Sequence, residues 1–189
     1  MKQLFGIHHL FILVVLFLTC NNSNQVSDDN KPDNCNQLEP GQKGFIHLVD
    51  NNEPGEPLII YGKIIDRKTG LPVINATLFL YQTDSTGVYN STGTEEQARI
   101  RGTVSAHSSG CFKIKTILPG DYPGRKNSRH LHYVINAKGY KEMKSILFFK
   151  GFTTENITGE GSLIVLDMKK DKAGTWTGST NLYLEPVDK

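Results

Sequence analysis

The chain has 189 residues, a formal net charge of +2 at pH 7 and 38% hydrophobic residues. This length suits a single domain. The small net charge, with no basic stripe along the chain, argues against a nucleic-acid partner and is compatible with a soluble protein.

The N-terminal end carries a targeting signal. Lys2 supplies a positive charge, and an apolar run follows from Leu10 to Thr19. As a helix this run would span about 15 Å, against a hydrocarbon core of about 30 Å, so it has the length of a signal-peptide hydrophobic region rather than of a membrane span. The letters FLTC at 17–20 resemble a bacterial lipobox, whose cysteine is lipidated. We expect a lipoprotein signal peptide over 1–19 and a bacterial cell-envelope protein held on a membrane by a lipid on Cys20. A plain signal peptide cut elsewhere is the alternative.

Residues 20–41 are polar, rich in Asn and Asp, and almost free of apolar side chains. Such a segment cannot bury a core, so we expect a flexible tether before a domain over 42–189. Besides Cys20, the chain holds Cys35 and Cys111. In an oxidising envelope these two cysteines could pair. The alternative is two free thiols, with Cys111 packed as a small apolar residue.

Short strand-like runs separated by Gly and Pro turns fill the rest of the chain, and no stretch shows a sustained 3.6-residue period. Many short strands without helices predict an all-β fold, either a sandwich or a barrel. A loop is expected over 152–161. The expected strands cover residues 58–65, 76–82, 99–105, 111–118, 131–137, 145–150, 163–168 and 175–184.

His130 and His132 occupy alternate positions at the start of one expected strand. Alternate strand residues point to the same face, so the two imidazoles would lie side by side. Imidazole is a common ligand of Fe, Cu, Zn and Ni, but two histidines supply only half a site. Tyr122 and Tyr89, both in turns, are the candidates for the remaining donors. The alternative is a pair of ordinary, partly exposed strand residues.

Three motifs resemble the intradiol ring-cleavage dioxygenases, the catechol and protocatechuate type. The first runs from Ile60 through Gly62, Gly70-Leu71-Pro72-Val73 and Tyr81-Gln82-Thr83-Asp84 to Gly87-Val88-Tyr89. The second contains Pro119-Gly120-Asp121-Tyr122-Pro123, and the third is His130-Leu131-His132. The similarity runs from about Ile59 to Tyr140 and continues more weakly to Leu184.

The resemblance implies a β-sandwich with immunoglobulin- or transthyretin-like layers and a non-haem Fe(III) centre. Its ligands would be Tyr89, Tyr122, His130 and His132. The implied reaction cleaves a catechol-type diol between its hydroxyls with O2 and gives a muconate-type diacid, so the chain would be an oxidoreductase. The family pattern makes Tyr122 the ligand that acts as a base and leaves, and Tyr89 the ligand that stays.

The chain departs from the family pattern at two positions that normally stabilise substrate charge. An arginine usually stands three residues before the first histidine, where this chain has Asn127, and a glutamine follows in the next strand, where our alignment places Ser145. We therefore expect simple catechol and protocatechuate to be poor substrates. Arg125 is the candidate substrate-binding replacement, whereas Arg129 should point to the face opposite the histidine pair.

Two other hypotheses stay open. The chain also resembles the regulatory-like β-sandwich modules of carboxypeptidases, through the glycines and turn residues from Gly62 to Pro72 and through Gly139-Tyr140. Those modules bind no metal, and the protein would then be a non-catalytic envelope module. The other hypothesis keeps the four ligands but places Zn or Cu between them. The histidine pair together with Tyr89 favours the dioxygenase, because the module has no reason to hold these residues.

Overall fold

The computed structural model describes residues 32–90, 97–153 and 163–187. In these ranges the regular structure is almost entirely strand, and the single helix described is the short 3-10 helix η1 (Pro32–Gln37). The predicted all-β fold is therefore confirmed. The strands are β1 (Phe45–His47), β2 (Pro57–Asp66), β3 (Thr77–Gln82), β4 (Ile100–Ser105), β5 (Cys111–Ile117), β6 (Ser128–Asn136), β7 (Met143–Thr153), β8 (Ile164–Leu166), β9 (Met168–Lys170) and β10 (Trp176–Leu184).

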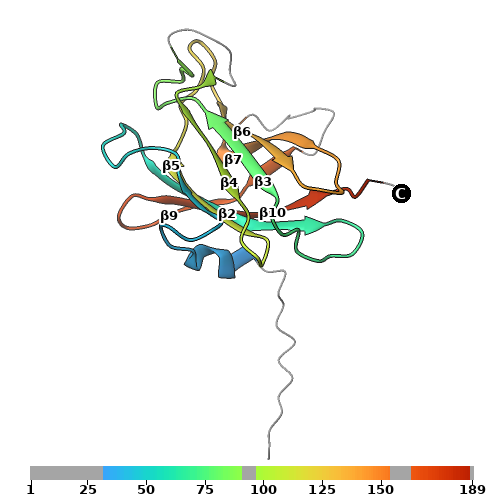
Figure 1. Cartoon of the computed structure of the whole chain (residues 1–189). Coiled ribbons are helices and arrows are strands. Elements are labelled where there is room, and N and C mark those ends of the chain that lie inside the picture. Colours follow the sequence, from blue (N-terminus) through green and yellow to red (C-terminus); the bar gives the residue numbers. More distant parts are fainter. Residues whose placement is uncertain (1–31, 91–96, 154–162, 188–189) are drawn as a thin grey trace, which may run out of the picture.

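The strands form two sheets that pack face to face as a sandwich (Figure 1). The first sheet has the order β1-β5-β2-β10-β9, and the second has the order β4-β3-β6-β7-β8. Most expected strands appear within three residues of their predicted bounds. The exceptions are β1, which was not expected, and the run over 163–168, which is divided between β8 and β9. The first two residues of the expected loop over 152–161 belong to β7, and the rest of that loop lies outside the described residues.

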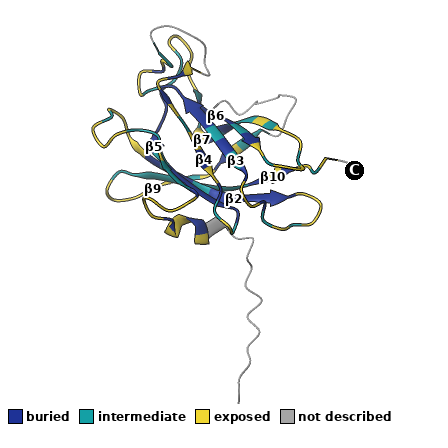
Figure 2. Cartoon of the chain, viewed as in Figure 1, coloured by how far each residue is buried: buried dark blue, intermediate teal, exposed yellow. Residues whose placement is uncertain are grey.

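Alternate residues of the central strands fill the space between the sheets. On β5, Phe112 and Ile114 are fully buried in the core, while Lys113 and Lys115 lie on the outer face of the first sheet. On β6, Leu131 and Tyr133 enter the same core from the second sheet. The buried stripe along the facing strands is dark blue in Figure 2. Each fully buried side chain of this size contributes about 1.5–3 kcal/mol to folding.

The domain begins earlier than predicted, because the second half of the expected tether over 20–41 packs against the first sheet. Cys35 in η1 forms a disulfide with Cys111 of β5, so pairing is confirmed and the free-thiol alternative is wrong. Leu38 is only 8% exposed, and its backbone carbonyl accepts a hydrogen bond from Lys113 Nζ at 2.9 Å. The disulfide, the buried Leu38 and the hydrogen bond from Lys113 hold the segment against the first sheet.

The predicted signal peptide over 1–19 and the lipidation site Cys20 lie outside the described residues, so both stay predictions. Among the residues that are described, no helix is long and apolar enough to cross a bilayer.

Two loops meet at one end of the sandwich, at the top of Figure 1. One follows β3 and the other joins β5 to β6. Their backbones touch at Gly87 and Gly120: a Cβ built on Gly87 would lie 1.8 Å from the carbonyl oxygen of Asp121. Gly87 also has a positive φ of 84°. Position 87 therefore requires glycine for two reasons, namely its positive φ and the lack of space for a Cβ.

The disulfide should stabilise the fold, because it ties together residues 76 positions apart. We expect the double variant Cys35→Ala/Cys111→Ala to lose about 2–5 kcal/mol of unfolding free energy. Urea unfolding, followed by the fluorescence of Trp176, measures this loss. Reductant should shift the wild-type transition by a similar amount. Reduction breaks the bond but keeps both cysteine side chains, so it distinguishes the effect of the bond from that of sulfur packing. An unchanged midpoint in both experiments would contradict the prediction.

The loop contact predicts unequal costs for two glycine substitutions. Gly124→Ala should cost about 1–2 kcal/mol, because φ is 78° but nothing lies within 4 Å of the new Cβ. Gly87→Ala has a similar φ and adds the steric conflict with Asp121, so it should cost clearly more. Urea midpoints of the two variants give the comparison. Equal shifts would show that the two loops can separate freely.

Candidate metal centre

The histidine pair lies on the outer face of the second sheet. Leu131 and Tyr133 point into the core, so His130 and His132 point outward, as their alternate positions predict. Their Nε2 atoms are 2.9 Å apart. His130 is 9% exposed, which is low for an outward-facing residue and indicates that other groups cover it.

Tyr89 lies in the loop after β3, and hydrogen bonds to the side chain of Asp84 stabilise the turn in this loop. The Oδ1 atom of Asp84 accepts hydrogen bonds from the backbone N–H groups of Thr86 at 2.9 Å and Val88 at 3.2 Å. Partial burial alone would raise the pKa of Asp84, but the hydrogen bonds from Thr86 and Val88 hold that pKa below its ordinary value. The backbone carbonyl of Tyr89 accepts a hydrogen bond from the N–H of Arg99 at 2.8 Å, which fixes the far end of the turn.

Tyr122 is delivered by the loop between β5 and β6. Its backbone N–H donates to Ser128 Oγ at 2.9 Å, and its carbonyl accepts from the N–H of Arg125 at 2.9 Å. The residues between Tyr122 and Ser128 are exposed. Tyr122 therefore sits at the base of a solvent-facing turn that returns directly to β6.

Four polar side-chain atoms meet where these elements converge. The hydroxyl oxygens of Tyr89 and Tyr122 are 2.6 Å apart. His130 Nε2 lies 3.1 Å from the Tyr122 oxygen and 3.4 Å from the Tyr89 oxygen. With the 2.9 Å contact to His132, this places two phenol oxygens and two imidazole nitrogens around one point. The structure thus brings together all four residues predicted as ligands.

The donor chemistry of this cluster fits a bound cation. His130 Nδ1 lies 2.5 Å from the carbonyl oxygen of Ser128, so Nδ1 carries the proton and Nε2 presents its lone pair to the cluster. Donor atoms that bind one first-row ion at about 2.0–2.1 Å lie roughly 2.9–3.4 Å apart at angles of about 90–110°. The contacts among the four atoms, 2.6 to 3.4 Å, are close to that range.

The phenol oxygens are essential to any metal centre here. Within the described residues, no three His, Cys, Asp or Glu side chains are grouped so that they could hold a metal ion. A site made of two imidazoles and two phenols favours an ion that stabilises phenolate, which is a hard, highly charged cation. This observation favours Fe(III) over Zn and Cu among the predicted ions.

Aromatic rings from the neighbouring strands frame the histidines. Tyr81 of β3 stacks on the His132 ring, with centroids 4.6 Å apart and an interplanar angle of 3°. Phe148 of β7 packs against the His130 ring at 5.6 Å. Neither residue was predicted to have a role in the site. In the strand register, Tyr81 lies directly opposite His132 and Phe148 lies directly opposite His130. The pairing of β3 and β7 with β6 is therefore the signal that could have identified both residues.

The alignment of Ser145 with the family's glutamine is wrong. In the register of β6 and β7, Ser145 lies opposite Tyr133, which points into the core. Directly paired residues share a face of the sheet, so Ser145 lies on the face away from the histidine pair. The β7 residues on the face of the site are Ile146, opposite His132, and Phe148, opposite His130. The wall of the site on this side is apolar.

Asn127, at the position of the missing arginine, shares an exposed turn with Arg125, whereas Arg129 lies on β6. Asn127 is exposed with a φ of 56°, a left-handed conformation that Asn tolerates better than most residues. Arg125 is exposed in the same turn, and its side chain makes no hydrogen bond or ion pair with the residues that the structure describes. The guanidinium of Arg129 lies 5.0 Å from the ring centroid of Phe152 and pairs with Asp121, away from the histidines as expected. Substrate binding by Arg125 stays a prediction.

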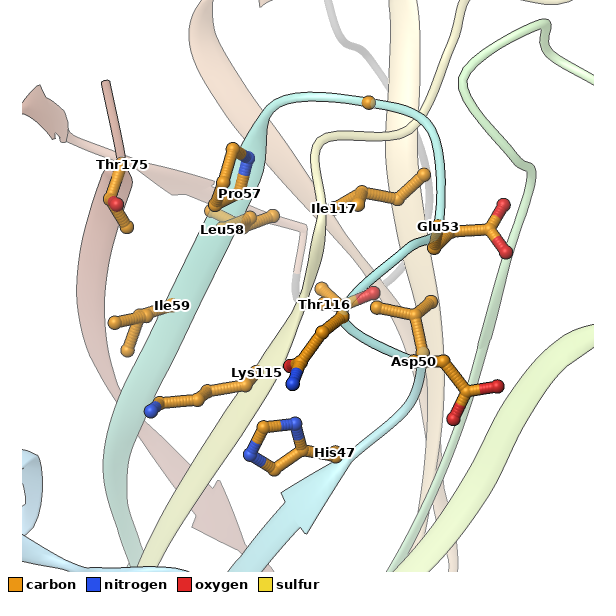
Figure 3. Close-up of a pocket in the computed structure, with 13 residues that line it drawn as sticks. His47, Asp50, Glu53, Pro57, Leu58, Ile59, Lys115, Thr116, Ile117 and Thr175 are labelled. Carbon is orange, nitrogen blue, oxygen red and sulfur yellow. The ribbon is translucent and has the colours of Figure 1, made fainter. Parts of the chain in front are cut away.

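A separate cavity of about 290 Å³ lies on the first sheet (Figure 3). His47 and Lys115 lie at one end, while the carboxylates of Asp50 and Glu53 point away from them. Its rim supports the Tyr89 loop: Arg99 donates two hydrogen bonds of 2.7 Å to Glu53 and lies 3.5 Å from Asp84. None of the four predicted ligands lines this cavity.

Known proteins are similar to this chain in sequence. The chain matches the profile of a protein family described as Dioxygenase over residues 30–158, which is more than half of its length. It is 26% identical to 6-chlorohydroxyquinol 1,2-dioxygenase of Cupriavidus pinatubonensis, over 94% of this chain and 74% of that relative. It is 27% identical to catechol 1,2-dioxygenase of Acinetobacter baylyi, over 55% of this chain but only 40% of that relative.

Solved structures give the same result. The dioxygenase domain of a dioxygenase carbohydrate-binding protein fusion from Streptomyces sp. SirexAA-E superimposes with a TM-score of 0.62 at 27% identity, covering 79% of this chain and 93% of that one. The 3-chlorocatechol 1,2-dioxygenase of Rhodococcus opacus 1CP has the same TM-score at 23% identity, covering 79% of this chain and 69% of that one, and shows the fold alone. The predicted β-sandwich is confirmed by these neighbours. The chain belongs to the intradiol ring-cleavage dioxygenases, a family of oxidoreductases.

Proposed function

We propose that this protein is a non-haem Fe(III)-dependent dioxygenase that cleaves a catechol-type aromatic diol between its hydroxyls with O2, giving a muconate-type diacid. The observation that carries the proposal is the convergence of two phenol oxygens and two imidazole nitrogens, linked by four contacts of 2.6–3.4 Å. Family membership supports it, as do the names of the two relatives, both 1,2-dioxygenases.

Tyr89, Tyr122, His130 and His132 would hold the iron. When bound, Fe(III) supplies a Lewis acid for the diol oxygens and the redox chemistry that O2 requires. The protein's own part is to present the imidazole lone pairs from a rigid strand and the phenol oxygens from two loops. It also binds and orients the diol, which brings the reacting atoms together.

The two tyrosines have different surroundings. Tyr89 packs among three rings, with centroids 6.2 Å from Tyr81, 5.8 Å from Tyr122 and 6.1 Å from His132. Tyr122 contacts the rings of Tyr89 and His130, and the exposed residues 123–127 follow it. Because this exposed turn follows Tyr122, we expect Tyr122 to be the tyrosine that turns aside. This supports Tyr122 as the base that takes a proton from the diol and Tyr89 as the fixed ligand.

The surroundings of the cluster support a larger or more electron-rich diol as the substrate. Ile146 and Phe148 make the β7 side of the site apolar. Asn127 gives no positive charge at the position of the family's arginine, and the turn around it is open to solvent. Arg125, exposed in that turn, is the cation we propose for any acidic group on the substrate.

The non-catalytic envelope module accounts for the β-sandwich, but it gives no reason for four polar donors to meet on the outer face of a sheet. Burying such groups together is unfavourable unless each is satisfied. The dioxygenase hypothesis explains both the fold and the cluster.

Iron content, colour and oxygen uptake test the proposed function. We expect the purified protein to bind about one Fe(III) and to be burgundy, because phenolate-to-iron charge transfer absorbs visible light. Oxygen-electrode assays with catechol, protocatechuate and larger diols should show uptake of one O2 per diol cleaved, with the diacid identified by mass. A folded protein that stays colourless after iron loading would contradict the centre. Cleavage beside the hydroxyls, or no uptake with any diol, would contradict the intradiol reaction.

The two tyrosine variants should differ. Tyr122→Phe should keep iron, shift the visible band and lower kcat by about 10²–10⁴-fold, because the proton acceptor is lost. Tyr89→Phe should weaken iron binding itself, because the ligand held among three rings is removed. Tyr183→Phe, an exposed tyrosine on β10, is the matched control and should change neither property. A wild-type rate for Tyr122→Phe would refute its assignment as the base.

A further inference from the structure

We propose that Ser128 is a positioning residue that couples two ligands of the candidate centre, Tyr122 and His130, and that Asp121 holds Ser128 in place. The proposal deepens the proposed function, because its effect on iron rests on Tyr122 and His130 being ligands. The contacts themselves are independent of any metal.

Each polar group of Ser128 serves a different partner. Its Oγ accepts a hydrogen bond from the backbone N–H of Tyr122 at 2.9 Å. Its carbonyl oxygen accepts from His130 Nδ1 at 2.5 Å. Its N–H donates to Asp121 Oδ1 at 2.7 Å. One serine therefore links the base of the Tyr122 turn to the ring of His130.

The local backbone explains why the Ser128 carbonyl is available. The pairing of β6 with β7 shifts register between Ser128 and His130, as in a β-bulge. Bulges interrupt the ladder and redirect groups near active sites. Here the carbonyl of Ser128 contacts the His130 ring two residues ahead. That contact sets the tautomer in which Nε2 carries the lone pair, as outer partners of ligand histidines commonly do.

Asp121 closes the turn. Besides the N–H of Ser128, its Oδ1 lies 3.4 Å from Ser128 Oγ, and its Oδ2 lies 3.6 Å from Arg129 Nε. The hydroxyl of Ser128 also lies 3.4 Å from the carbonyl oxygen of Arg125. Because the residues between Tyr122 and Ser128 are exposed, these contacts at the base of the turn are what fix its ends.

The contacts predict distinct consequences for two substitutions. Ser128→Ala removes the acceptor for the Tyr122 N–H, together with the longer contacts of the hydroxyl to Asp121 and the Arg125 carbonyl, and keeps the carbonyl that sets the His130 tautomer. Asp121→Ala releases Ser128 as a whole, so both ligands lose their support. Asp121→Asn retains an Oδ1 acceptor for the Ser128 N–H and should behave as a rescue variant.

The test compares these three variants and the control Lys126→Ala, an exposed residue of the same turn, in the whole protein. Iron dissociation constants and the charge-transfer maximum report on the loaded centre, and ring ¹⁵N shifts of His130 report its tautomer in metal-free protein. Asp121→Ala should weaken iron binding about 10–100-fold and mix the tautomers. Ser128→Ala should shift the band and leave the tautomer unchanged. Asp121→Asn and Lys126→Ala should resemble wild type.

Wild-type affinity, band and tautomer in a folded Asp121→Ala protein would overturn the proposal. If Asp121→Ala does not fold, Ser128→Ala decides, because it removes a single hydroxyl, and an unshifted band would then overturn the coupling. Failure of the proposed function looks different: wild-type protein itself would not bind iron. The tautomer measurement would still decide whether Asp121 and Ser128 hold His130.

Discussion

The phenol pair exists because two loop backbones lie in direct contact. A Cβ on Gly120 would be 2.5 Å from the nitrogen of Gly87, so neither loop can carry a side chain there. The N–H of Gly120 donates to the carbonyl of Asp84 at 2.8 Å, and Thr83 Oγ1 donates to the carbonyl of Gly120 at 3.1 Å. These backbone contacts bring two tyrosines 33 residues apart within hydrogen-bonding distance. Their spacing thus depends on main-chain geometry.

The four candidate ligands come from one strand and from two loops. The histidines stand on β6, which is paired on both sides by β3 and β7, and their rings lean on Tyr81 and Phe148. The tyrosines come from connections, which are the parts of a fold where function and motion concentrate. For the proposed centre, this division places the two imidazoles on the strand and Tyr122, the ligand proposed to act as a base and leave, on a loop.

Local patterns predicted the strands and the histidine pair, because strand alternation has a period of two that short stretches reveal. They could not predict that Tyr89 and Tyr122 meet, because that depends on contacts between distant loops; the resemblance to a family supplied it. The order in residues 32–41 was missed for a similar reason. Composition there is polar, and the segment is held by Cys35 and Leu38 through partners far along the chain, including Cys111.

The Ser145 assignment was wrong because it put this residue on the wrong face of β7. A shift of one residue moves every side chain of a strand to the other face, and an alignment alone does not fix that shift. Once the β6–β7 register is known, the positions beside the histidines belong to Ile146 and Phe148. On the turn side, Asn127 is exposed and uncharged, and Arg125 is the cation proposed to replace the family's arginine. For the proposed reaction, recognition of the substrate beyond its two hydroxyls therefore depends on apolar contact with Ile146 and Phe148 and on Arg125 in the exposed turn.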